Sequence, residues 1–154
     1  MGSYYLIHLW AILAVLTTGL YSGASLHVLL VEHPARMACA TPVALAQWRC
    51  SVRQAARVQP VYAVLGTVFG VLSWWGDGGL LFLAAAALLG ATIPFRRLVV
   101  RPVVRQLLDE ALDPAGARTR DLLAAYGRLH AVRSVLSLVA FGLMLLQGLW
   151  VWGM

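Results

Sequence analysis

Long apolar stretches alternate with shorter polar segments along this chain. Four apolar windows, at residues 4–31, 58–75, 79–95 and 129–152, are almost free of charged side chains. Because a helix rises about 1.5 Å per residue, each window is about long enough to cross ~30 Å of hydrocarbon. Backbone amides find no water in the bilayer core, so segments that cross it must be helical. The pattern predicts an all-α fold, a four-transmembrane-helix bundle that forms a single integral-membrane domain over residues 1–154.

The charge pattern predicts how this bundle lies in the membrane. All twelve basic residues are arginines, and they fall in two segments, 36–57 and 96–133. Arginine-bearing connections stay on the cytoplasmic side of a membrane. We therefore expect both termini outside (N-out/C-out), in a multi-pass protein of the cell (inner) membrane. The net charge of +6 then faces anionic lipid headgroups, and we expect a lipid bilayer and no nucleic acid as partner.

Composition agrees with a lipid environment. Hydrophobic residues make up 61% of the chain and charged residues 12%, and the mean hydropathy is +0.79. These values exclude an ordinary soluble domain. No nucleotide-binding loop, Cys-x-x-Cys motif or nucleophile elbow occurs in the sequence. Any chemistry must therefore use the few polar side chains near membrane depth.

A polar segment between the first two windows has helical periodicity. Over residues 42–58 the apolar positions lie opposite Arg49, Arg53 and Arg57. An arginine face meets lipid phosphates, and a tryptophan such as Trp48 commonly sits at headgroup depth. We therefore expect an amphipathic interfacial helix between the first and second spans.

The third and fourth windows have helical extensions on the same side. The pattern continues over residues 97–112, with Pro94 and Pro102 as expected kinks or breaks. From Thr119 the helical pattern enters the last window without a helix breaker, so the fourth helix should project into the cytoplasm.

Polar residues of the first and fourth helices should meet at the cytoplasmic end of the bundle. An acidic residue at a membrane boundary is costly unless it is paired or hydrated, which makes Glu32 a functional candidate together with its neighbour His33. His130 and Arg133, three residues apart, share a helix face that complements Glu32. The structural alternative is a Glu32–Arg133 salt bridge between the two helices, with His130 donating to a backbone carbonyl.

Several short motifs are distributed along the chain. They are Gly-Ala-Ser-Leu at 23–26, Val-Glu-His-Pro-Ala-Arg at 31–36, Ala-Thr-Ile-Pro-Phe at 91–95, Ala-Leu-Asp-Pro at 111–114 and Gly-Arg-Leu-His-Ala-Val-Arg at 127–133, with Trp48 and Pro60. These motifs resemble those of the anthrone oxygenase-like family of small four-helix membrane proteins, and the resemblance covers nearly the whole chain. The chain departs from the family where Pro-Val-Val at 102–104 replaces Pro-Thr-Asn, at Arg96 after Phe95, and at His27 and Leu29.

Some members of that family oxidise anthrones to anthraquinones in polyketide pathways. The resemblance implies a membrane oxygenase or oxidase that acts with O2 on a lipophilic, anthrone-like aromatic small molecule entering between helices. Glu32 or His33 would be the general base, since an anthrone carbanion is delocalised into a phenolate and reacts with O2 without an organic cofactor. Arg133 would stabilise the oxyanion, with His130 in the same catalytic cluster. The expected substrate-binding residues are Trp48, Tyr62, Thr92 and Tyr126.

Two alternatives stay open. In the first, His27, His33 and His130 join Glu32 as metal ligands, because imidazole with carboxylate suits copper or iron. In the second, the protein is a non-enzymatic structural or accessory membrane subunit in which the same polar residues form a clamp. Small residues such as Gly66, Gly70 and Gly90 favour close helix packing within one chain or in a homo-oligomer.

Overall fold

The computed structural model describes residues 2–77 and 79–153, which are mostly helical with no strand among them. The elements in chain order are α1 (Gly2–His27), the π-helical turn η1 (Val28–Glu32), α2 (His33–Ala38), α3 (Thr41–Asp77), α4 (Leu80–Phe95), the π-helical turn η2 (Arg96–Val100), α5 (Arg101–Leu108) and α6 (Ala117–Gly153). Consecutive elements form four rods that are long and apolar enough to cross a membrane. The predicted all-α, multi-pass architecture is confirmed.

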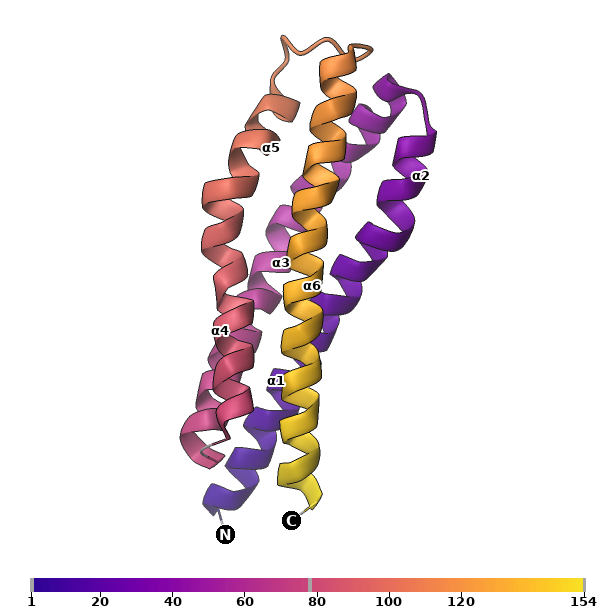
Figure 1. The fold of residues 1–154 in the computed structure, drawn as a ribbon. Helices are drawn as coiled ribbons and strands as arrows, with labels where there is room; N and C mark the ends of the chain where they lie inside the picture. Colours follow the sequence, from indigo (N-terminus) through magenta and orange to yellow (C-terminus); the bar gives the residue numbers. More distant parts are fainter. Residues whose placement is uncertain (1, 78, 154) are drawn as a thin grey trace.

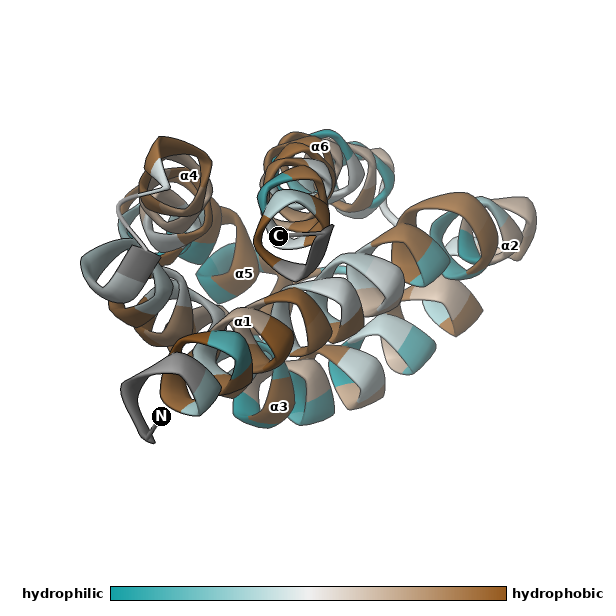
Figure 2. Cartoon of the chain, turned by 90° about the horizontal axis from the view of Figure 1, so that it is seen from below, coloured by the Kyte–Doolittle hydropathy of each residue, from teal (hydrophilic) through white to brown (hydrophobic). Residues whose placement is uncertain are grey.

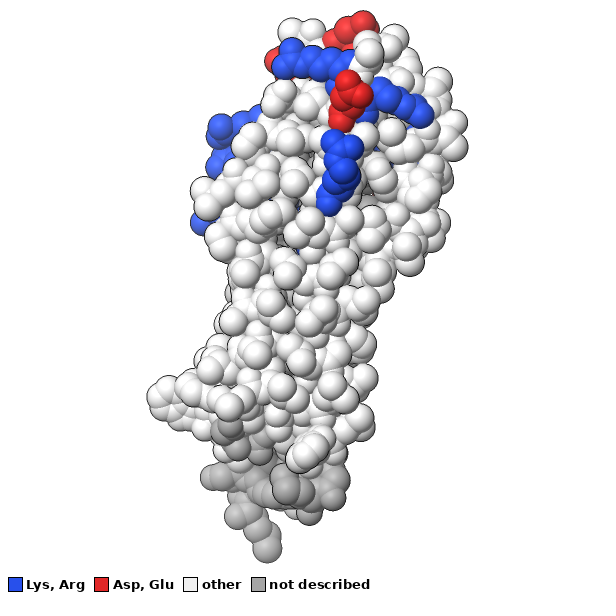
Figure 3. All heavy atoms as spheres, in the orientation of Figure 1, with Lys and Arg blue, Asp and Glu red and all other residues white. Residues whose placement is uncertain are grey.

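The four rods lie side by side, with both chain ends at one end of the bundle and the α2–α3 and α5–α6 connections at the other (Figure 1). Helix α1 packs on α3 and α6, and α4 packs on the same two helices. Seen from the end that carries the termini, the nearest turns of α4 are mostly apolar (Figure 2). On the face drawn in Figure 3, the charged side chains gather at the opposite end.

Two prolines are accommodated by widened helical turns. A proline inside an α-helix clashes with the carbonyl four residues earlier. Just before Pro34 and Pro102 the chain forms a π-helical turn: the N–H of His33 bonds the carbonyl of Val28, and the N–H of Arg101 bonds that of Arg96. The first rod therefore continues beyond the predicted end of its window at residue 31, as far as Ala38. Such turns recur at functional sites.

The amphipathic segment expected between the first two spans is helical but is not a separate element. Helix α3 runs unbroken from Thr41 to Asp77 and includes both the amphipathic segment and the second span. No glycine or proline interrupts residues 43–59, and Pro60 removes a single backbone hydrogen bond without ending the helix. Trp48 is also not at the lipid surface, because only 1% of it is exposed. It packs in an apolar cluster with residues of η2, α5 and α6.

That apolar cluster lies near the arginine-bearing end, and a second one fills the centre of the bundle. In the central region the small residues serve contacts within the chain. A β-carbon at Gly66 would collide with Leu89 and Thr18, and one at Gly70 with Met144. Close helix packing therefore uses these glycines inside the bundle.

Candidate functional site

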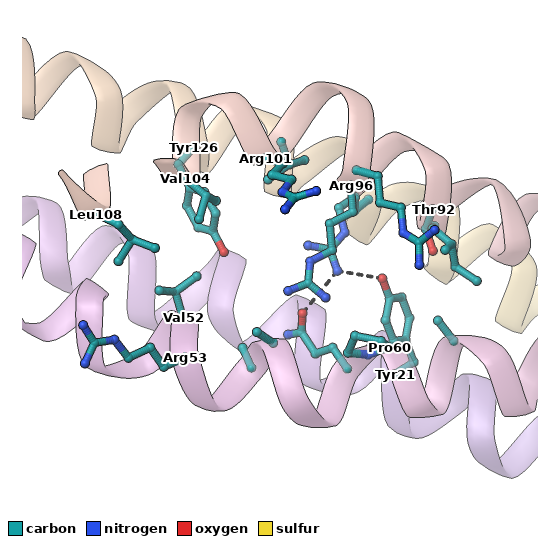
Figure 4. A pocket seen from close by; sticks show the side chains of 18 residues that line it. Tyr21, Val52, Arg53, Pro60, Thr92, Arg96, Arg101, Val104, Leu108 and Tyr126 are labelled. Carbon is teal, nitrogen blue, oxygen red and sulfur yellow. Dashed lines mark hydrogen bonds between the residues drawn. The ribbon is translucent and has the colours of Figure 1, made fainter. Parts of the chain in front are cut away.

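A pocket of about 430 Å³ opens between α3 and the continuous α4–η2–α5 rod. Tyr21 from α1 and Tyr126 and Arg133 from α6 complete its wall. Figure 4 shows Arg96 and Arg101 on the side opposite Val52 and Pro60 of α3. Ligand pockets are commonly about 300–1,000 Å³, so this cavity is large enough for a small multi-ring molecule. We refer to it as the larger pocket.

A smaller pocket of about 240 Å³ lies beside it, on the α1 side. Glu32, Arg36, Trp48 and His130 line it. The two pockets share part of their walls, namely Val52, Ala55, Gln59 and Tyr126. The structure thus brings Glu32 and His130 to one cavity, as predicted, and places Arg133 in the adjoining one.

Arg133 is buried, with 3% of its surface exposed. Its Nη2 donates to the Tyr21 hydroxyl oxygen at 2.8 Å and to Oε1 of Gln59 at 3.1 Å, as the dashed lines in Figure 4 show. Its Nε has no hydrogen-bond partner. Neutral oxygens from two other helices, α1 and α3, therefore hold this guanidinium group of α6.

The alternative of a Glu32–Arg133 salt bridge is wrong. Glu32 instead accepts from Nη2 of Arg36 at 3.2 Å. The two residues lie four positions apart, so they share a helix face and meet without any interhelical contact. Arg36 also donates from Nε to Gln47 at 2.5 Å and from Nη2 to Ser51 at 3.3 Å, which ties the end of the first rod to α3.

His130 is oriented by a backbone carbonyl. Its Nε2 lies 3.1 Å from the carbonyl oxygen of Ser25, and the ring is 2% exposed. A carbonyl oxygen only accepts, so Nε2 carries the proton and Nδ1 of the neutral ring keeps its lone pair. That Nδ1 is buried and has no partner. The expected contact of His130 with a backbone carbonyl is confirmed.

Aromatic rings line the shared region of the pockets. The rings of Tyr126 and His130 stack with centroids 6.1 Å apart, and Trp48 meets Tyr126 edge-on at 5.2 Å. Of the predicted substrate-binding residues, Trp48, Thr92 and Tyr126 line a pocket. Thr92 turns its hydroxyl to the Leu89 carbonyl at 2.6 Å. Tyr62 lines neither pocket and packs against the central apolar cluster.

The four predicted metal ligands are not brought together. His27 is exposed on the outside of α1, and His33 lines neither of the two pockets. Within residues 2–77 and 79–153, no group of three or more His, Cys, Asp or Glu side chains is arranged to hold a metal ion. Since successive helical residues point about 100° apart, His27, Glu32 and His33 of one rod diverge.

Sequence reasoning did not single out several polar pocket residues, among them Tyr21, Arg36, Gln59 and Arg96. The sequence could have marked Gln59 as a pocket residue, because a polar amide inside the second apolar window usually faces the bundle interior. Tyr21 had no such signal, because a tyrosine in an apolar stretch fits equally well at a lipid interface or in a core.

Comparison with known proteins gives one match. The anthrone oxygenase family model matches residues 48–143, which include Gln59, Arg96, Tyr126, His130 and Arg133. No curated protein and no solved structure matches the chain. The family match spans more than half of the 154 residues. The chain belongs to the anthrone oxygenase family.

Proposed function

We propose that this protein is a membrane oxygenase that converts an anthrone-like aromatic substrate to the corresponding quinone with O2. One observation carries the proposal: His130 offers an unpartnered Nδ1 lone pair, in a ring fixed by the Ser25 carbonyl and stacked on the Tyr126 ring that lines both pockets. A fixed imidazole base beside an aromatic cavity suits removal of a carbon-bound proton. The protein's membership in the anthrone oxygenase family agrees with this chemistry.

The reaction balances without an added reductant. His130 takes one proton from the ring CH2 group, and the electron pair left behind is delocalised into a phenolate. The carbanion transfers electrons to O2 and a C–O bond forms, giving a hydroperoxide after protonation. Loss of the second C–H proton then breaks the O–O bond, and the products are the C=O group and one water molecule. The CH2 carbon is oxidised, and both oxygen atoms of O2 are reduced.

Arg133 and Tyr126 are suited to stabilise the phenolate. A preformed donor aimed at developing negative charge lowers the barrier without reorganisation cost. Arg133 is already held by Tyr21 and Gln59, and its Nε is unpartnered. Glu32 is engaged with Arg36, which favours His130 over Glu32 as the base.

The substrate reaches the site sideways through the larger pocket. Arg53 on α3 and Arg97 and Arg101 on the opposite rod are exposed residues of its lining, so they form its rim. A lipophilic molecule dissolved in the membrane would pass between α3 and α5 without leaving the hydrocarbon. The rings would then lie against Tyr126, near His130.

The test is an anthrone conversion assay with the purified full-length protein. Aerobic buffer should give quinone faster than the spontaneous reaction, with one O2 consumed per substrate and one atom of isotopically labelled O2 in the new carbonyl. Conversion should stop without O2. The His130→Asn variant, which cannot act as a base, serves as the control for spontaneous oxidation. Equal rates for this variant and the wild type would refute the proposal.

A further inference from the structure

The larger pocket contains more positive charge than the proposed reaction needs. Its lining includes five arginines and no acidic residue: Arg53, Arg96, Arg97, Arg101 and Arg133. A single developing phenolate needs one cation. Within the described part of the chain none of these five arginines takes part in a salt bridge, since Glu32 pairs with Arg36 instead.

Arg96 is the cation that most needs a partner. It is half-buried in the pocket wall, where water solvates a charge less well than at the surface. Arg133 lines the same pocket, so a second positive charge faces the same cavity. A buried charge without a counter-charge is destabilising, and a second like charge adds to that cost. Arg133 also lacks a counter-charge: it is 3% exposed and its Nε has no hydrogen-bond partner.

The backbone directs Arg96 and Arg101 to the same cavity. The π-helical turn that begins at Arg96 closes where the N–H of Arg101 bonds the Arg96 carbonyl, so the two residues lie one turn apart. Both line the larger pocket, on the side opposite α3 (Figure 4). A guanidinium group binds a carboxylate through two parallel hydrogen bonds, which a neutral group of the same shape cannot reproduce.

We propose that the larger pocket binds an aromatic carboxylate, with Arg96 holding its acid group and Arg101 guiding it in from the rim. The nature of the aromatic body rests on the proposed function, whereas the acid group rests on the charge of the pocket. Ile93, Val100 and Pro60 offer the apolar wall against which rings would pack. The depth of Arg96 favours a ligand of the bundle interior over a phospholipid headgroup, because lipid phosphates meet the exposed rim arginines first.

The test compares two probes of the same shape, anthraquinone-2-carboxylate and its neutral carboxamide. Binding is measured by titration calorimetry with the full chain in phosphatidylcholine nanodiscs. Charge-assisted hydrogen bonds should make the carboxylate bind about tenfold or more tightly. Arg96→Gln should remove this preference and leave carboxamide binding unchanged. Arg105→Gln is the matched control, since Arg105 is exposed on α5 and lines neither pocket.

A second variant separates the charge of Arg96 from its geometry, and a second lipid separates a carboxylate ligand from lipid headgroups. Arg96→Lys retains the charge and loses the two-pronged geometry, so it should keep only part of the preference; it replaces Arg96→Gln if that variant does not fold. The wild-type preference should persist in phosphatidylglycerol nanodiscs. If the anionic lipid abolishes it, the arginines serve lipid headgroups and the proposal is overturned. Equal binding of both probes by the wild type would also overturn it.

Failure of this inference is separable from failure of the proposed function. Neither probe has a CH2 group to oxidise, so binding is measured without turnover. A carboxylate preference without any anthrone conversion would uphold the binding site and reject the reaction. Anthrone conversion without a carboxylate preference would reject the binding site alone.

Discussion

His33 of α2 packs directly against Gly127 of α6. A β-carbon at position 127 would overlap the imidazole ring of His33, so only glycine fits there in this arrangement. Gly127 lies within a helix and needs no unusual backbone conformation, which means that the close approach of the two helices is the reason for this residue. The contact places the end of the first rod beside α6, at the level of His130.

Gly127→Ala should therefore destabilise the protein. The new methyl group must displace His33 or separate α2 from α6, and such overpacking typically costs about 1–3 kcal/mol. Thermal unfolding in detergent should show a clear fall in melting temperature. Gly142→Ala is the matched control on the same helix, because a β-carbon there meets nothing within 4 Å. That variant should be neutral or slightly more stable, since alanine favours helix over glycine. Equal melting temperatures for the two variants would contradict the packing described here.

A double-mutant cycle should find Glu32 coupled to Arg36 and uncoupled from Arg133. Contacting charges usually show coupling energies of about 0.5 kcal/mol or more, whereas residues without shared partners add independently. The Glu32 side chain is 31% exposed, so solvent screening keeps the Arg36 coupling modest. Unfolding midpoints of Glu32→Gln, Arg36→Gln, Arg133→Gln and the two double variants give both cycles.

The reverse result, coupling to Arg133 alone, would restore the interhelical salt bridge that the sequence suggested. Such a result would also move Glu32 towards the larger pocket and strengthen its candidacy as the catalytic base.

His130→Ala should abolish most anthrone conversion, by about a hundredfold or more, because a single general base commonly contributes that much. His27→Ala should be close to neutral, since His27 is exposed and lines neither pocket. The pair also separates two mechanisms. A metal site that includes both histidines predicts loss of activity in both variants, together with loss of bound copper or iron in elemental analysis. Normal turnover by His130→Ala would rule out His130 as the base, whereas absence of conversion by the wild type would favour the accessory-subunit alternative.

The sequence predicted those features of the fold that follow from periodicity and solvation. Four apolar windows predict four helical rods. The polar residues of the first and fourth rods are predicted to meet at one end of the bundle. Helix boundaries were less predictable. The first apolar window ends at residue 31, whereas the rod continues past Pro34 through a widened turn that depends on a backbone bond pattern no single residue signals.

Side-chain pairing was the least predictable level. The sequence offers Glu32 two candidate arginines, Arg36 on its own rod and Arg133 on the fourth. The choice of Arg36 depends on the helix face that η1 presents. The burial of Trp48 has the same origin, because continuation of α3 as one helix turns the amphipathic face towards α5 and α6. Arg49 likewise donates to the carbonyls of Leu107 and Asp109, at 2.9 and 2.7 Å, where lipid phosphates were expected.

The arginines predict which end of the bundle faces the cytoplasm. The α2–α3 and α5–α6 connections lie at the same end of the bundle, with arginines in or beside both, and that end should be cytoplasmic (Figure 1). Cys39 lies at the α2–α3 connection and is exposed, so Cys50→Ser leaves it as the sole thiol. A membrane-impermeant maleimide should label Cys39 only in permeabilised cells. A cysteine added after the last residue should be labelled in intact cells, which controls for access of the reagent. Labelling of Cys39 in intact cells would invert the topology and place both pockets near the outer face.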